Sequence, residues 1–148
     1  MQFTKMEGLG NDYIYIDCFR EKVENPKDLA IKMSDRHFGV GGDGIILIEP
    51  SDKADAYMHM FNADGSEGAM CGNGIRCTAK YIYDHGIVRP DIPLIKIETK
   101  SGMKEIRYEV KDGKLFQATV DMGEVKLDSN LPEKIQVEDL NLSFAGIN

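Results

Sequence analysis

The chain has 148 residues, which is enough for one ordinary domain with a hydrophobic core. Hydrophobic residues make up 42% of the sequence and charged residues 29%, a balance that excludes a disordered chain and a membrane-embedded one. The formal net charge of −7 argues against binding to a nucleic-acid backbone, which requires a basic face.

The sequence has no apolar run that approaches the length of a membrane span, and its start lacks the apolar core of a signal peptide. Its three cysteines are odd in number and irregularly spaced, which argues against a disulfide framework. We therefore expect a cytoplasmic protein with reduced thiols.

The first part of the chain predicts two strands and a helix. Residues 2–6 and 13–19 have strand composition, and the glycine-rich segment 8–12 between them predicts a turn. Asn25 followed by Pro26 predicts a helix start, because asparagine caps helices and proline fits the first helical position. This helix is expected to run to about residue 36, with an apolar face formed by Leu29, Ala30 and Met33.

The middle and end of the chain predict mainly strands around one more helix. Strand patterns follow at 45–48, 56–61, 94–99, 104–110 and 115–122, and a helical pattern covers 75–85. Asp112–Gly113 is a hairpin signal, because both central residues of that turn need positive φ. Beyond Gly123 the pattern weakens to short runs at 135–137 and 142–144. With about seven to nine strands and two helices, the chain predicts an α+β fold with much antiparallel sheet. Composition alone leaves the order of the strands in the sheet open.

The glycine-rich stretch 62–77 joins a predicted strand to the second predicted helix and places Cys71 at the helix start. Backbone N–H groups there lack partners within the helix, and the macrodipole is positive, so both favour a thiolate. Gly72 and Gly74 have no β-carbon, so an anion can approach the N–H groups beside the sulfur. The position favours a reactive thiol over a buried structural one, although nearby Asp64 and Glu67 could oppose the charge.

Other candidate sites are weaker. The glycines of 39–44 follow a helix and precede a strand, the reverse of a dinucleotide-binding loop, so we expect a tight turn there. Cys71 and Cys77 lie too far apart, among scattered histidines, to suggest a zinc site. We expect no cofactor and no metal. Cys77, like Cys18, is expected to be a small buried hydrophobe.

Three asparagines occur in glycine-rich turns, where asparagine tolerates a left-handed backbone. Their side chains could instead recognise carboxylate and ammonium groups. The residues alone favour the conformational role for Asn11 and leave the role of Asn62 and Asn73 open.

Several ordered segments together resemble the diaminopimelate epimerase family. They are residues 3–12, 36–44, 61–66 and 70–77, with shorter matches at 98–99, 101–102 and 120–123. The resemblance implies a fold in which a mostly antiparallel sheet or barrel wraps around a central helix. The family interconverts LL- and meso-diaminopimelate without pyridoxal phosphate. One cysteine thiolate removes the α-proton, and a second cysteine returns a proton from the opposite face.

The resemblance also assigns roles by position. Cys71 is similar to one of the two acid/base cysteines. Gly72 and Asn73 are similar to the residues whose backbone N–H groups hold the reacting carboxylate. Asn11 and Asn62 are similar to substrate contacts, Asn62 toward the distal end of the substrate. The glutamine contact of some members is absent here, since Gly44 stands at that position.

The family folds as two similar halves with the active site between them. The resemblance therefore implies an N-terminal half over 1–123, without its final returning strand, and the truncated start of a second half over 124–148. The implied partners are diaminopimelate, the missing C-terminal half and, since the family often forms homodimers, a second copy. Two other functions stay open, namely another racemase of the same fold, such as one acting on proline, and a non-catalytic ligand-binding domain.

Overall fold

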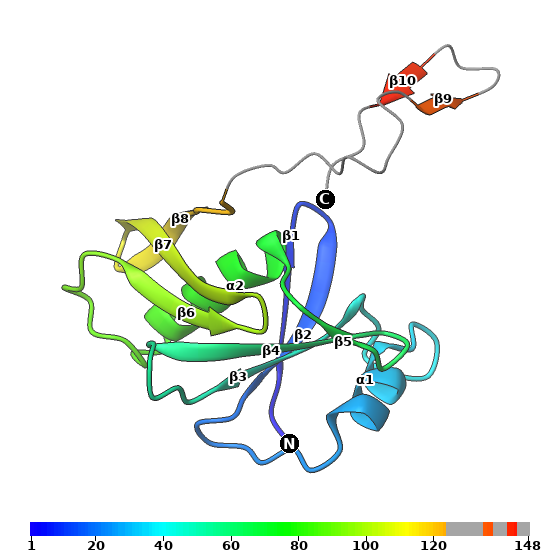
Figure 1. Ribbon diagram of the computed structural model, residues 1–148. Helices are drawn as coiled ribbons and strands as arrows, with labels where there is room; N and C mark the ends of the chain where they lie inside the picture. The colour runs from blue at the N-terminus through cyan, green and yellow to red at the C-terminus, as the bar shows by residue number, and fades with distance from the viewer. Residues whose placement is uncertain (124–134, 138–141, 145–148) are drawn as a thin grey trace.

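A curled mixed sheet surrounds helix α2 (Gly72–Asp84), and helix α1 (Pro26–Ser34) covers the other face of the sheet (Figure 1). The computed structural model describes residues 1–123, 135–137 and 142–144. The strands of the sheet are β1 (Thr4–Gly8), β2 (Asn11–Asp17), β3 (Gly44–Glu49), β4 (Ala56–Asn62), β5 (Glu67–Gly68), β6 (Ile95–Thr99), β7 (Gly102–Lys111) and β8 (Lys114–Val120). A separate antiparallel pair is formed by β9 (Ile135–Val137) and β10 (Leu142–Phe144).

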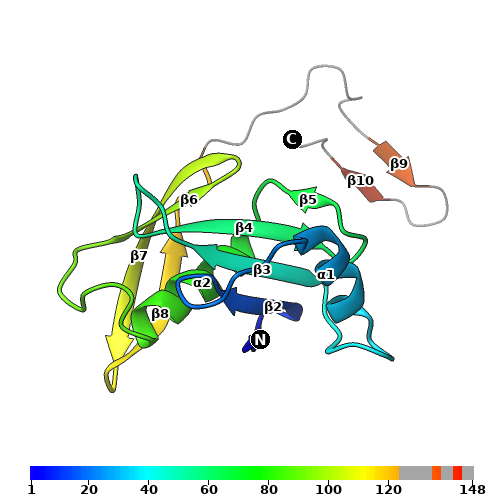
Figure 2. The same ribbon diagram turned by 90° about the horizontal axis from the view of Figure 1, so that it is seen from below.

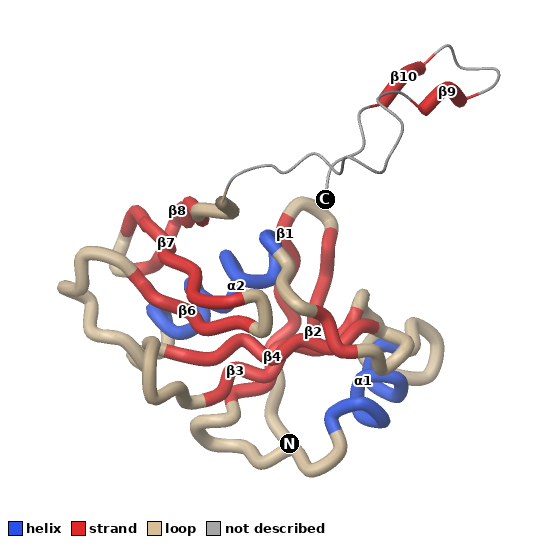
Figure 3. Tube along the Cα trace, in the orientation of Figure 1, coloured by secondary structure: helices blue, strands red, loops and turns tan. Residues whose placement is uncertain are grey.

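The strands of the sheet run in the order β1-β2-β3-β4-β6-β7-β8, and the short β5 pairs with β4. The pairs β2–β3 and β4–β6 are parallel, whereas the other pairs are antiparallel. Parallel neighbours need a crossover connection, and the two helices lie in these two crossovers (Figure 3). The predicted α+β fold with a mostly antiparallel sheet around a central helix is therefore confirmed, with two parallel pairs added.

The two faces of the central strands carry separate hydrophobic clusters. On the inner face, Ile75, Ala79 and Ile82 of α2 pack against alternate residues of β2, β3 and β4. On the outer face, Ala30 of α1 packs against the intervening residues, such as Ile45. Figure 2 shows α1 in front of these strands and α2 behind them. Because both faces of these strands are covered, β2 and β3 contain unbroken apolar runs. Burial of each of their isoleucine side chains stabilises the folded state by about 1.5–3 kcal/mol.

The hairpin of β1 and β2 is tighter than the sequence predicts. Only Leu9 and Gly10 form the turn, with φ of 55° and 84°, and Asn11 pairs with Gly8 inside the ladder. Two residues with positive φ match the twist of a hairpin, which explains the short turn. The placement of Asn11 in a turn was therefore wrong. The second hairpin is as predicted, with φ of 53° at Asp112 and positive φ at the following glycine.

The helix ends also differ slightly from the prediction. Asn25 caps α1 as expected, but the helix ends at Ser34, because the carboxylate of Asp35 accepts the backbone N–H groups of His37 and Phe38. Helix α2 starts three residues before the predicted position, at Gly72. Its last turn ends at His85, whose Nδ1 lies 2.9 Å from the carbonyl oxygen of Tyr81, as expected of a C-terminal histidine.

The predicted second half, 124–148, lies largely outside the described residues. The short strands predicted at 135–137 and 142–144 are confirmed as β9 and β10. The division into 1–123 and 124–148 stays a prediction. No helix in the described part of the chain is long and apolar enough to cross a membrane.

Gly44 provides a test of the packing between β2, β3 and β4. A β-carbon at this position would stand 2.1 Å from the carbonyl oxygen of Phe61 and 2.8 Å from Cε1 of Tyr13. We expect Gly44→Ala to lower the free energy of unfolding by about 3 kcal/mol, because backbone of β4 must move. Urea denaturation followed by circular dichroism measures this. The matched control is Gly72→Ala, where the nearest atom is 3.5 Å away, and equal losses in both variants would contradict the prediction.

Candidate active site at the start of helix α2

The sulfur of Cys71 caps helix α2. Cys71 has extended backbone angles, with φ of −136° and ψ of 119°, and its Sγ accepts the N–H of Gly74 at 3.3 Å. Its carbonyl oxygen accepts the N–H of Ile75 at 2.9 Å. The side chain is half-buried and borders the inner hydrophobic cluster. The sequence thus correctly predicts a cysteine at the positive end of the helix, within reach of a backbone donor.

Two more backbone donors lie beside the sulfur. Among the described residues, the N–H groups of Gly72 and Asn73 have no hydrogen-bond partner. Met122, which follows β8, lies near Gly72, since a β-carbon placed on Gly72 would be at ordinary contact distance from its side chain. Free N–H groups at a helix start can bind a carboxylate, so the arrangement has the donors that the predicted anion cradle requires.

Asn11 is the side chain that β2 brings to Cys71. The Sγ of Cys71 donates to Oδ1 of Asn11 at 3.1 Å, and Nδ2 of Asn11 donates to Oδ2 of Asp43 at 2.6 Å. Both ends of the amide are therefore engaged by the protein. The structure places Asn11 beside Cys71, and its role as a substrate contact stays a prediction.

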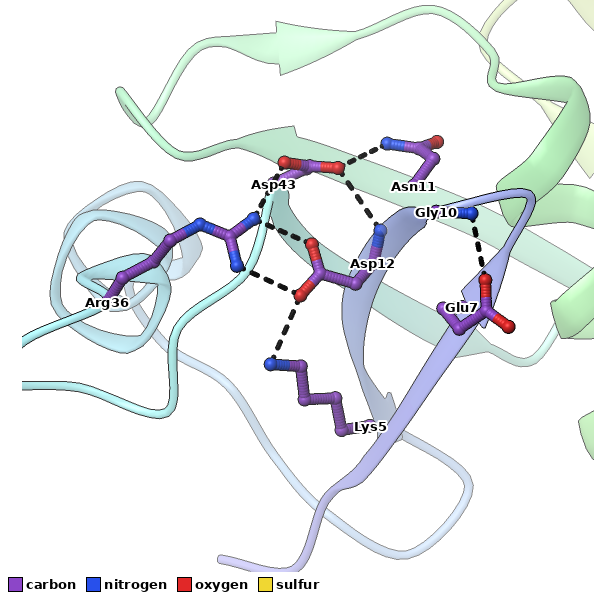
Figure 4. A network of polar contacts seen from close by, with 7 residues as sticks. All are labelled: Lys5, Glu7, Gly10, Asn11, Asp12, Arg36 and Asp43. Carbon is purple, nitrogen blue, oxygen red and sulfur yellow. Dashed lines mark hydrogen bonds and ion pairs between the residues drawn. The ribbon is translucent and has the colours of Figure 1, made fainter.

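Asp43 belongs to a network of ion pairs that borders this site (Figure 4). Arg36 donates to both carboxylate oxygens of Asp12, at 2.7 and 3.1 Å, and to Oδ1 of Asp43 at 3.0 Å. Lys5 lies 3.1 Å from Asp12. Hydrogen bonds from Arg36, with a smaller contribution from Lys5, hold the pKa of Asp12 well below its usual range. This network fixes the loop before β3 against the start of β2.

Asn62 lies in a row with Gly44 and Tyr13 across β4, β3 and β2. Residues opposite each other share one face, so the row lies on the inner face, where β3 begins and β4 ends. The first turn of α2 rests one row further in, where a β-carbon on Gly74 would stand 2.7 Å from Cδ1 of Ile46. The row is therefore adjacent to the helix start that carries the sulfur of Cys71.

The contacts of Asn62 and Asn73 are local. Nδ2 of Asn62 donates to Oγ of Ser66 at 2.9 Å, and among the described residues no hydrogen bond joins Asn62 to Cys71. Oδ1 of Asn73 accepts from Arg76, and its β-carbon packs against Gly8 at the end of β1. The side chain of Asn73 is thus hydrogen-bonded within its own helix. The group of Asn73 that is available to a ligand is its backbone N–H.

The acidic groups that could have opposed a thiolate are paired elsewhere. Asp64 accepts from the backbone N–H and the hydroxyl of Ser66, at 2.8 and 2.6 Å. Glu67 pairs with Lys100 at 3.0 Å and lies 3.4 Å from His59. Two hydrogen bonds, through Asn11, connect the carboxylate of Asp43 to the sulfur, and sequence patterns did not identify this link.

The other thiols occupy apolar surroundings. Cys18 and Cys77 are free and half-buried, and each packs against a hydrophobic cluster. Burial raises the pKa of Cys18 to about 11 and also raises the pKa of Cys77. Within the described residues no group of three histidine, cysteine or acidic side chains is arranged to hold a metal ion.

Tyr13 and Asp43 are site residues that the sequence patterns missed. Burial raises the pKa of the Tyr13 phenol, and the neighbouring Cys71 and Asp43 add to the rise. The ring of Tyr13 also leans over Gly44, where a β-carbon would meet it, so no larger side chain fits there. The only sequence signal was an acidic residue inside a glycine-rich loop, which is common in ordinary turns.

Most of this chain is similar to one protein family. Residues 3–127 match the family model described as diaminopimelate epimerase. A diaminopimelate epimerase of Acetivibrio thermocellus is 55% identical over 93% of this chain and 47% of its own length. One from Desulfovibrio desulfuricans is 56% identical over 86% of this chain and 44% of its own length. The chain thus spans about half the length of the curated relatives it matches.

Solved structures with low sequence identity share the fold. A hydroxyproline epimerase from Agrobacterium vitis has a TM-score of 0.67 and 16% identity, over 97% of this chain and 47% of that one. A probable proline racemase from Agrobacterium radiobacter has a TM-score of 0.64 and 17% identity, over 92% of this chain and 45% of that one. At such identities the likeness concerns the fold alone.

The ion pairs of Asp12 predict a defined pH dependence. Because its folded pKa lies below its unfolded one, its stabilisation is complete above about pH 4 and is lost as the pH falls further. We expect Asp12→Asn to lower the free energy of unfolding by about 1 kcal/mol near neutral pH, since Arg36 is largely exposed and screened. Urea denaturation at about pH 7, 5 and 3 should show this difference shrinking at the lowest pH.

The exposed Asp91, which has no ion pair among the described residues, supplies the control variant Asp91→Asn. Its stability relative to the unmodified chain should change little between these pH values. A loss in Asp12→Asn that is the same at every pH would contradict the role given to the carboxylate charge.

Proposed function

The chain belongs to the diaminopimelate epimerase family, and we propose that it supplies one half of an active site that interconverts LL- and meso-diaminopimelate. One observation carries this proposal. The sulfur of Cys71 caps helix α2 and accepts the N–H of Gly74 at 3.3 Å, next to the N–H groups of Gly72 and Asn73, which have no hydrogen-bond partner within the described residues. A proton-carrying sulfur and donors for an anion thus lie at one helix start.

The chemistry of epimerisation needs both of these features. An α-proton of an amino acid is a very weak acid, so its removal requires a positioned base and stabilisation of the charge that forms. The N–H groups of Gly72 and Asn73 would bind the α-carboxylate, into which the carbanionic electron pair delocalises. Exclusion of water by a second half would strengthen these hydrogen bonds.

The proposed reaction inverts the α-carbon through two sulfur atoms. On one face a thiolate takes the α-proton, so that an S–H bond forms, a C–H bond breaks and the electron pair passes to the carboxylate. On the other face a thiol gives its proton to the α-carbon, so that a C–H bond forms and the sulfur is left as a thiolate. Cys71 is one of these two groups, and the second belongs to the other half of the protein.

Other roles follow from the family and from the length of the chain. Asn11 and Asn62 are proposed as substrate contacts, Asn62 toward the distal end, where its amide would meet the non-reacting amino acid group. The segment 1–123 is the proposed N-terminal half. The partners are the small-molecule substrate, a C-terminal half and a second copy in a homodimer, in the cytoplasm as part of lysine biosynthesis.

Two further functions compete with this proposal. The first is a racemase for another amino acid, since a hydroxyproline epimerase and a probable proline racemase share the fold. The second is a ligand-binding domain without catalysis. The motifs at 62–66 and 71–74, together with relatives at more than half identity, favour the diamino acid.

In an intact protein with both halves, Cys71→Ser should abolish most of the activity. We expect exchange of the α-protium of diaminopimelate for solvent deuterium to slow by about 10²–10⁴-fold, because a hydroxyl is a far poorer acid/base group than a thiol. Nuclear magnetic resonance measures the exchange. The matched control is Cys77→Ser, a cysteine of the same helix that packs against the hydrophobic cluster and should keep most activity.

The same assay separates the competing functions. Exchange with proline but not with diaminopimelate would favour a racemase of another specificity. Binding of diaminopimelate to the intact protein with no exchange would favour a non-catalytic domain. Exchange by Cys71→Ser at the rate of the unmodified protein would contradict the acid/base role proposed for Cys71.

The 148-residue chain by itself should catalyse no exchange. Its other thiols, Cys18 and Cys77, are half-buried with raised pKa values, so neither is suited to serve the second face of the substrate. Incubation of the purified chain with diaminopimelate in deuterium oxide checks this. Exchange above the rate of a Cys71→Ala control would show that one half suffices for proton removal.

A further inference from the structure

The amide of Asn11 stands between a carboxylate and the sulfur of Cys71. Its Nδ2 lies 2.6 Å from Oδ2 of Asp43, and its Oδ1 lies 3.1 Å from Sγ of Cys71. Figure 4 shows the amide of Asn11 directed toward Asp43, together with the other donors on this carboxylate. The three side chains come from β2, from the loop before β3 and from the cap of α2, and they form one connected line.

The partners of Asp43 determine which way the Asn11 amide faces. Oδ2 of Asp43 also accepts the backbone N–H of Asp12 at 3.1 Å, and Oδ1 accepts from Arg36 at 3.0 Å. Both oxygens of this carboxyl group thus act as acceptors for N–H donors. The group of Asn11 that faces it must therefore be the NH₂ group. The amide oxygen is left pointing at the sulfur of Cys71.

An amide oxygen beside a sulfur favours one protonation state. The oxygen can only accept, so its hydrogen bond to Cys71 exists while the sulfur carries a proton. A thiolate would lose this bond and face the negative end of the amide dipole, while it keeps the N–H of Gly74 as a donor. Rotation of the Asn11 amide would relieve the conflict, but it would break the bond to Asp43.

We propose that Asp43 is a positioning residue for Cys71, which it holds through Asn11 as a hydrogen-bond-donating thiol in the chain without substrate. The inference deepens the proposed function, because it assigns Cys71 the role of the group that starts with the proton. During turnover the S–H bond of Cys71 breaks and a C–H bond forms at the α-carbon. The carbanionic electron pair of the α-carbon forms the C–H bond, and the electron pair of the broken S–H bond stays on the sulfur, which still accepts the N–H of Gly74.

Other titratable groups near the sulfur do not compete with this effect. Tyr13 and Tyr15 of β2 and Cys77 of α2 interact with Cys71, and burial is the main cause of the raised pKa of each. They are mainly uncharged between about pH 6 and 9. Asp43 is the charged group on the line that reaches the sulfur, and it acts through the amide of Asn11.

The test measures how fast iodoacetamide alkylates Cys71 in the substrate-free chain, with the modified peptide quantified by mass spectrometry from about pH 6 to 9. We expect Asp43→Ala to free the Asn11 amide, which can then turn its NH₂ group to the sulfur. The alkylation rate near pH 7 should rise about tenfold, and the rate profile should move about one pH unit toward acid. At the highest pH the rates of the two proteins should converge.

Asn11→Ala removes the acceptor itself and should shift the profile in the same direction. In the double variant the effect of Asp43→Ala should disappear, because Asp43 acts through Asn11. Asp12→Asn breaks the neighbouring ion pairs without touching this line and should leave the profile in place. Thermal unfolding of each variant establishes that it is folded.

Three results would overturn the proposal. One is an unmoved profile in Asn11→Ala, a test that stands even if Asp43→Ala fails to fold. Another is an effect of Asp43→Ala that persists in the Asn11→Ala background. The third is a rate increase of equal size at every pH, which indicates opening of the site. Because the assay contains no diaminopimelate, failure of the epimerase proposal would leave its outcome unchanged.

Discussion

The close approach of helix α2 to the sheet determines where the sulfur of Cys71 lies. Gly74 rests on β3 at a point where a β-carbon would stand 2.7 Å from Cδ1 of Ile46. Its carbonyl oxygen accepts from the hydroxyl of Thr78 at 3.0 Å and from that of Tyr15 on β2 at 3.4 Å. The first turn of the helix is thus tied to two strands. Cys71, which caps this turn, is therefore held close to β2 and β3.

The sulfur held there receives two contacts of opposite preference. The N–H of Gly74 can donate to a thiolate, whereas Oδ1 of Asn11 requires a proton on the sulfur. A group that takes a proton and later returns it needs both of its states to be accessible at the same pH. A site that stabilised the thiolate alone would make a good base and a poor acid. The geometry around Cys71 is consistent with a sulfur that is required to act in both directions.

Local signals in the sequence predicted the parts of the structure that depend on neighbouring residues. They placed Cys71 at a helix start, found the hairpin at 112–113 and gave the extent of most strands. They failed where distant segments meet. The bond from Asn11 to Asp43 joins residues 32 positions apart, and it depends on the parallel pairing of β2 with β3, which a pattern of strands does not reveal. The position of Asn11 itself was missed because a two-residue turn and a five-residue turn contain the same kinds of residues.

The geometry also explains why a family with this fold would need two halves. A helix start offers its free N–H groups and its capping side chain from one direction, so Cys71 can serve one face of a bound amino acid. Inversion of a stereocentre requires a proton to leave from one face and to arrive on the other. The remaining thiols of the chain, Cys18 and Cys77, pack against hydrophobic clusters and are poor proton carriers. A second sheet and helix of the same design, facing the first, would supply the missing face with the same type of donor and the same type of cap.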